Sequence, residues 1–107
     1  MEYFQLSDLE AEQKVKGGLY FQFISEEKLS VGLYKLEAGS IDRQNPHSED
    51  EVYYVLKGRA MIRVGTETQE IKPGSIIFVR AGDDHKFSSI KEDLELFVFF
   101  VPAHKPA

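Results

Sequence analysis

Short runs of β-forming residues, separated by turn signals, constrain this chain more than any other feature of its sequence. The runs cover residues 19–24, 29–37, 51–58, 59–64, 68–72, 75–80, 85–90 and 94–101. Turn-forming pairs such as Gly65-Thr66 and Pro73-Gly74 separate several of them. Turn signals roughly every 8–12 residues, without a long segment of period 3.6, are typical of a β-sandwich or barrel. The sequence therefore predicts an all-β fold.

The two ends of the chain are expected to lie outside this β core. Residues 5–14 are compatible with a short helical turn, although their apolar spacing is thin. Pro102 ends the last run, and residues 102–107 are expected to form a loose tail. With 107 residues and no internal repeat, we expect one domain over 1–107, with its core at about 19–101 and a short N-terminal extension.

The composition excludes several classes of protein. Thirteen basic and 18 acidic residues give a net charge of −5 without long runs of one sign, which argues against nucleic-acid binding and weakly against anionic membranes. No apolar run approaches the roughly 20 residues that span a bilayer. The chain lacks cysteine, and its start lacks the apolar segment of a signal peptide. We expect a cytoplasmic protein without nucleic-acid or membrane partners.

Residues 39–58, GSIDRQNPHSEDEVYYVLKG, carry the clearest chemical signal. His47 stands four residues before Glu51. On one uninterrupted strand two such residues would lie about 13 Å apart, too far to share an ion. The residues between them, Ser48, Glu49 and Asp50, favour a turn, and a turn there would bring Glu51 back beside His47.

This stretch resembles the first motif of the cupins, which has the form G-x5-H-x-H-x3-E-x6-G. Asn45 stands at the position of the first His, His47 at the second and Glu51 at the acid. The second cupin motif, G-x5-P-x-G-x2-H-x3-N, is matched by Gly74, Arg80, Gly82, His85 and Ser89, with Arg80 in place of Pro and Ser89 in place of Asn. The two motifs and the 15 residues between them cover about half of the chain. The resemblance implies a small single-domain cupin of the cupin 2 type, folded as a double-stranded β-helix or jelly-roll barrel.

The same resemblance implies a metal site. It assigns His47, Glu51 and His85 as ligands of a divalent ion, for which Fe, Mn, Ni, Co and Zn are all suitable. Asn45 departs from the motif, and its amide oxygen is a weaker ligand for these metals than imidazole. Its neighbour Gln44 is the alternative, and we place Asn45 slightly ahead on spacing. His104 lies in the Pro-flanked tail and is not expected to take part.

Two further residues are candidates for the pocket. Tyr53 shares strand parity with Glu51, so it should face the interior, either lining a pocket or packing in the core. Arg80 precedes the loop that leads to His85 and would either hold an anionic group or lie exposed, and we favour the exposed position. Glu49 is expected to be a turn or rim residue.

Residues 52–56 and 96–101 are apolar on both faces of their strands. A small monomer should not expose such faces, and cupins usually pair through sheet surfaces, so we expect a homodimer. The alternative is that the N-terminal segment covers the same face within one chain.

The sequence thus predicts a metal-binding cupin that acts on or binds a small molecule in the barrel, with the reaction undetermined. One alternative is a non-enzymatic ligand-binding barrel whose metal is structural or absent. Another is an Fe-dependent dioxygenase-like or isomerase-like enzyme. The fold alone does not choose among them.

Overall fold

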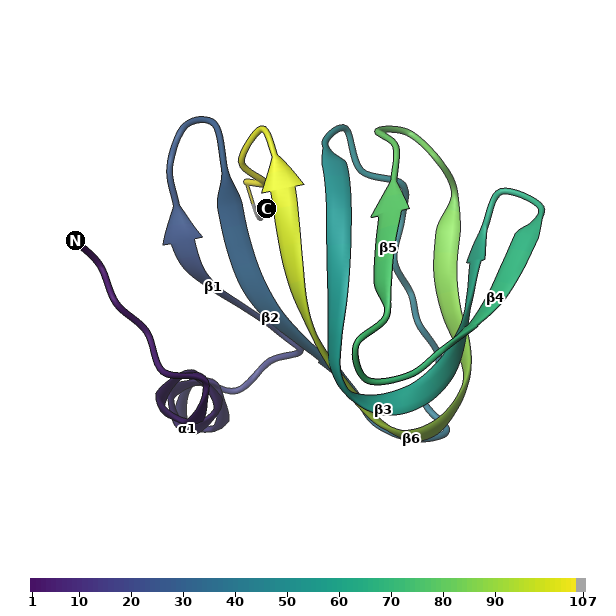
Figure 1. Cartoon of the computed structure of the whole chain (residues 1–107), viewed down its shortest axis with the longest axis horizontal. Coiled ribbons are helices and arrows are strands. Elements are labelled where there is room, and N and C mark those ends of the chain that lie inside the picture. The colour runs from purple at the N-terminus through teal and green to yellow at the C-terminus, as the bar shows by residue number, and fades with distance from the viewer. Residues whose placement is uncertain (106–107) are drawn as a thin grey trace.

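The computed structural model describes residues 1–105 and shows an antiparallel β-structure with one N-terminal helix (Figure 1). Its elements are α1 (Leu6–Lys16), β1 (Tyr20–Ser25), β2 (Ser30–Leu36), β3 (Asp50–Val64), β4 (Glu67–Ile71), β5 (Ile76–Val79) and β6 (His85–Val101). The strands pair in the order β1-β2-β6-β3-β4, and β5 pairs with β3. The predicted all-β fold is confirmed.

β3 and β6 are each one long strand, whereas the sequence predicted two shorter strands for each. Figure 1 shows both strands bending at the base of the molecule, so that the sheet curls back on itself. The first half of β3 pairs with β5 and the end of β6, and its second half pairs with β4 and the start of β6. Two strands therefore supply both walls of the barrel.

Gly58 lies where β3 bends. The β3–β6 register shifts on both sides of it, between Val55 and Lys57 and again between Lys57 and Arg59. Its φ is 95°, and a Cβ on it would lie only 2.4 Å from the Asp93 carbonyl oxygen of β6. Only glycine accepts this backbone conformation and this close approach together.

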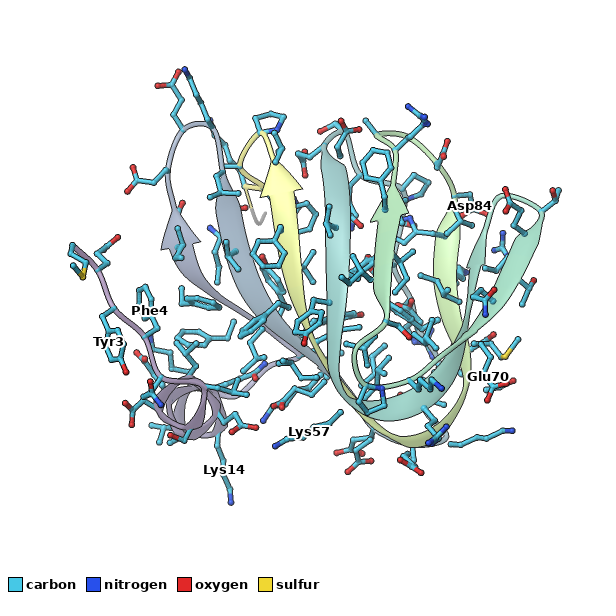
Figure 2. The ribbon with its side chains drawn as sticks, in the orientation of Figure 1. Tyr3, Phe4, Lys14, Lys57, Glu70 and Asp84 are labelled. Atoms are coloured by element: carbon cyan, nitrogen blue, oxygen red, sulfur yellow. The ribbon has the colours of Figure 1, made fainter. Side chains whose placement is uncertain are left out.

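The bend also changes which side chains of β3 face inward. Tyr53 and Val55 are buried before it, and Ala60 and Ile62 after it, so the buried residues switch from odd to even numbers. This switch keeps both halves of the strand facing one interior, which Figure 2 shows filled with side chains from the two walls. The buried core consists of Leu36, Tyr53, Val55, Ala60, Ile62, Ile71, Val79, Phe87, Ile90, Leu94, Leu96, Val98 and Phe100. Each large apolar side chain among them contributes about 1.5–3 kcal/mol by leaving water.

The helix α1 packs outside the barrel, against the outer face of β1 and β2. Leu9 meets Phe21 and Leu33 there, and Gln13 donates hydrogen bonds from Nε2 to the backbone oxygens of Leu19 and Leu33, both at 3.1 Å. Only two helix residues are buried, which explains the thin apolar spacing in the sequence. No helix within residues 1–105 is long and apolar enough to cross a membrane.

The N-terminal segment covers only part of the outer sheet surface. Phe97 packs against the cluster beneath α1. Tyr54, Ile76, Phe78 and Val101, farther along the same surface, remain 38%, 71%, 53% and 52% exposed. We call these four residues the apolar strip. Cover by the N-terminal segment therefore accounts for only part of this surface, and the expected homodimer stays a prediction.

Candidate metal centre

Three predicted side chains meet at the open end of the barrel. His47 comes from the loop before β3, Glu51 from the start of β3 and His85 from the start of β6. The Nε2 atom of His47 lies 3.3 Å from Glu51 Oε1, and that of His85 lies 3.2 Å from Glu51 Oε2. One nitrogen or oxygen from each residue lies within 4.8 Å of those of the other two. We call His47, Glu51 and His85 the inner group.

The inner group holds a buried carboxylate without ordinary hydrogen-bond partners. Glu51 and His85 are each 1% exposed, and within the described residues neither Glu51 carboxylate oxygen has a hydrogen-bond partner. The His85 Nδ1 atom is 3.0 Å from the Asp83 carbonyl oxygen. Because a carbonyl only accepts, Nδ1 carries the proton, and the Nε2 lone pair of a neutral ring then faces Glu51. A cation, either a proton or a metal ion, is needed between these groups.

The surroundings move the pKa values of the two histidines in opposite directions. Burial lowers the pKa of His47, and the nearby Glu51 carboxylate offsets this only in part. For His85 burial also acts to lower the pKa, but Glu51 and the Asp83 carbonyl outweigh it, so the pKa is raised. His47 is thus favoured in the neutral form that binds metals.

Gln44, rather than Asn45, is directed toward the inner group. Asn45 is exposed, whereas Gln44 is half-buried and its Oε1 accepts a hydrogen bond of 3.2 Å from the Tyr53 hydroxyl. Gln44 Nε2 donates to Asp42 Oδ2 at 2.8 Å, which fixes the orientation of the amide.

Asp42 organises this loop, although no motif in the sequence singled it out. It is 2% exposed and accepts hydrogen bonds from the Gln44 and Phe87 backbone nitrogens, at 3.1 and 2.9 Å. The Tyr34 hydroxyl donates a further bond to it, at 3.3 Å. Asp42 therefore ties the loop before β3 to β6.

The two candidate pocket residues lie in different places. Tyr53 is fully buried, and its hydroxyl oxygen lies 3.0 Å from His85 Nε2. Burial, with Glu51 as a further cause, raises its pKa well above the usual value, so the phenol is neutral. Arg80 does not join this group: it is exposed, and its guanidinium carbon lies 5.5 Å from the centre of the Phe78 ring.

A cavity of about 160 Å³ adjoins the inner group. Its walls are mostly aromatic, with a few polar atoms among them; they are formed by Tyr20, Tyr34, Gln44, His47, Val98, Phe100 and His104. His47 thus belongs both to the inner group and to the cavity wall.

His104 was not expected near the site, but the structure places it there. Its Nδ1 lies 2.8 Å from Glu49 Oε1, and its backbone nitrogen donates to Ser30 Oγ at 2.8 Å. Its ring stacks on Phe100 with centroids 4.6 Å apart. His104 is therefore held against the barrel, while residues 106–107 of the expected tail lie outside the described part. No sequence pattern pointed to this return of the tail.

A curled antiparallel sheet with two histidines and a carboxylate at its open end defines a class of barrel protein. Residues 32–102 match the model of the cupin domain, and the chain belongs to this family. It is 51% identical over 102 residues to an uncharacterised protein of Streptomyces coelicolor, covering 95% of this chain and 97% of that one.

Solved structures support the same fold. The protein TT1209 from Thermus thermophilus superposes with a TM-score of 0.79 at 29% identity, covering 95% of this chain and 98% of that one. The DMSP lyase DddQ from Ruegeria pomeroyi superposes with a TM-score of 0.69 at 20% identity, and covers 77% of this chain. This chain spans only 42% of the lyase, so the likeness concerns the fold alone.

Proposed function

We propose that this cupin binds one divalent metal ion through the inner group and a small molecule in the adjoining cavity. The observation that carries the proposal is the Glu51 carboxylate, which is buried between two imidazoles while both of its oxygens lack hydrogen-bond partners among the described residues. A buried charge of this kind is costly unless a cation compensates it.

The spacing of the inner group supports a metal ion. Two ligand atoms that are each about 2.1 Å from an ion, at tetrahedral or octahedral angles, lie about 3.0–3.4 Å apart. The two Nε2–oxygen distances are 3.3 and 3.2 Å. Two imidazoles and one carboxylate suit Fe, Mn, Ni, Co or Zn, and three protein ligands leave positions open for water or substrate. Such an ion, when bound, supplies Lewis-acid or redox chemistry.

The neighbouring residues would orient a ligand beside the ion. Tyr53 offers a neutral hydroxyl next to His85, and Gln44 offers an amide oxygen held by Asp42. We therefore propose Gln44, in preference to Asn45, as the residue whose amide faces the ion. The cavity wall contains no Lys or Arg among the described residues, which favours a small, largely apolar ligand over a phosphate or a dicarboxylate.

A non-enzymatic binding barrel is the second candidate, because a small aromatic cavity also suits simple ligand capture. Fe-dependent oxygenase or isomerase activity is a more specific form of the first candidate, the metal-binding cupin that acts on a small molecule. The two candidates differ in turnover, which requires the ligand to react at the metal, whereas capture requires only the cavity walls. The expected cytoplasmic location remains a prediction.

The proposal is tested by metal analysis of protein purified without a nickel column. We expect about one divalent ion per chain, and none in the His47→Ala variant. Oxygen uptake and product formation by the metal-loaded protein are then screened with small aromatic and aliphatic compounds. Turnover that stops in His47→Ala supports an enzyme, whereas thermal stabilisation by a compound without turnover supports a binding barrel. Metal-free protein even after reconstitution with Fe, Mn, Ni, Co and Zn would contradict the metal site.

We also propose that two copies pair through the apolar strip. Ile76 and Phe78 lie on β5, which pairs only with β3 among the described strands, so a second sheet can approach them. Light scattering after size-exclusion chromatography should give a dimer. Phe78→Asp should give a monomer, because a carboxylate would be desolvated at the contact, whereas Lys28→Asp, in the β1–β2 connection, should leave the dimer intact. A wild-type monomer at micromolar concentration would contradict this pairing.

A further inference from the structure

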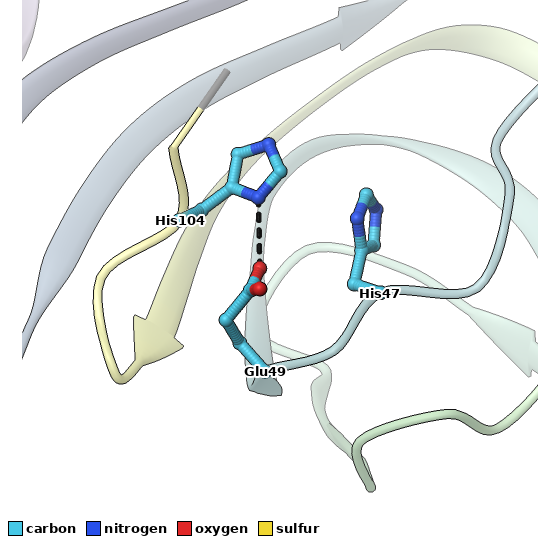
Figure 3. A group of neighbouring side chains, drawn as sticks. All are labelled: His47, Glu49 and His104. Carbon is cyan, nitrogen blue, oxygen red and sulfur yellow. Dashed lines mark hydrogen bonds and ion pairs between the residues drawn. The ribbon is translucent and has the colours of Figure 1, made fainter. Parts of the chain in front are cut away.

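A second group of metal-binding side chains lies at the mouth of the cavity. His47, Glu49 and His104 each offer one nitrogen or oxygen within 4.8 Å of the others. Figure 3 shows the three side chains together, with the contact between His104 of the tail and Glu49, directly before β3, and the His47 ring beside it. We call His47, Glu49 and His104 the outer group.

Several contacts hold the outer group in place. His104 is fixed by its backbone bond to the fully buried Ser30 and by its stacking on Phe100. Glu49 accepts a hydrogen bond from Ser48 through its second carboxylate oxygen. The His47 and His104 ring centroids lie 5.0 Å apart. The donor atoms are therefore already gathered before any ion arrives, which reduces the entropy lost on binding.

The chemistry of the outer group repeats that of the inner group. Both consist of two imidazoles and one carboxylate, the ligand set that suits zinc and its neighbours in the first transition row. They differ in burial: the side chains of His47, Glu49 and His104 are 22%, 11% and 23% exposed, whereas those of Glu51 and His85 are 0% and 1% exposed. The outer group is therefore nearer to solvent.

We propose that the outer group is a second divalent-cation position, which shares His47 with the inner group. A neutral imidazole has one free lone pair, so His47 serves one ion at a time. One ion per chain then occupies either position. The inner position, with its carboxylate buried and unpaired among the described residues, is preferred when it is intact.

A simpler arrangement would be an ion pair of His104 with Glu49 that only anchors the tail. That arrangement predicts no contribution of His104 to metal binding under any condition. The two can be separated by disabling the inner position and asking whether binding then depends on the outer one.

The test is calorimetric titration of zinc chloride into the metal-free full chain and its variants. Glu51→Gln removes the inner carboxylate charge and keeps its shape, and we expect it still to bind about one zinc ion, more weakly than the wild type. Adding His104→Phe, which keeps a ring to stack on Phe100, or Glu49→Gln should abolish this remaining binding. His104→Phe alone should bind zinc as the wild type does. Equal zinc binding by Glu51→Gln with and without His104→Phe, or none by Glu51→Gln, would overturn the outer position.

Imidazole NMR gives a second measurement that does not depend on affinity. The chain has only three histidines, so each ring can be followed separately. On adding zinc to Glu51→Gln, we expect the ring nitrogens of His47 and His104 to shift while those of His85 stay in place. Shifts of His47 and His85 without His104 would overturn the proposal. This outcome leaves the inner site standing, whereas wild-type protein that binds none of Fe, Mn, Ni, Co and Zn would contradict the proposed function as well.

Discussion

Zinc added to the metal-free protein at 100 times its dissociation constant should stabilise the fold by about 2.7 kcal/mol, since it binds the native state alone. His47 and His85 are 38 residues apart in the chain, so an unfolded chain does not assemble the inner group. For a domain of this size the gain corresponds to a rise in melting temperature of about 10 °C or more. Differential scanning calorimetry with and without zinc measures it.

Variants of the two groups give matched controls for this gain. His47→Ala should show no stabilisation by zinc, because His47 belongs to both groups, whereas His104→Phe should keep the full gain. The His47 side chain is partly exposed, so its truncation should leave the metal-free fold intact. An undiminished zinc effect in His47→Ala would show that zinc binds elsewhere.

Gly58→Ala should destabilise the protein by about 2–5 kcal/mol, the sum of a left-handed backbone cost and an overpacking cost. The added Cβ would lie 2.4 Å from the Asp93 carbonyl oxygen and 2.8 Å from the Leu94 Cα. Both are backbone atoms of β6, so neither can turn aside as a flexible side chain would. Urea unfolding of the purified variant measures the change.

Gly74→Ala is the matched control. Gly74 has nearly the same φ, 92° against 95°, but a Cβ there would meet nothing within 4 Å. It should cost only about 1–2 kcal/mol. Equal losses at the two glycines would mean that backbone conformation alone, and not the approach of β6, requires glycine at Gly58.

The fold was predictable because short β-runs and turn residues carry it locally. The continuity of β3 could not be predicted, because Gly58 resembles a turn residue in the sequence. Only the pairing with β6 shows that Gly58 marks a bulge within one strand. The helix α1 was predicted weakly for a similar reason. Its packing depends on one leucine and a buried glutamine, Leu9 and Gln13, rather than on an apolar stripe.

Motif spacing identified the three residues of the inner group, since each stands at a fixed distance from a glycine of its motif. The order of Gln44 and Asn45 could not be read from spacing. It depends on Asp42, whose carboxylate holds the Gln44 amide inward. The position of His104 could not be predicted from the sequence. It follows from the path of the chain after Val101 and from a hydrogen bond to Ser30, 74 residues earlier.

The attachment of the tail has a practical consequence for handling this protein. An affinity tag fused after Ala107 would be separated by only three residues from His104, which lines the cavity. A run of tag histidines there would be well placed to compete for the metal or to fill the mouth. The N-terminus lies on the opposite side of the β1–β2 hairpin from the C-terminal tail in Figure 1. Tags and surface attachments are therefore better placed before Met1.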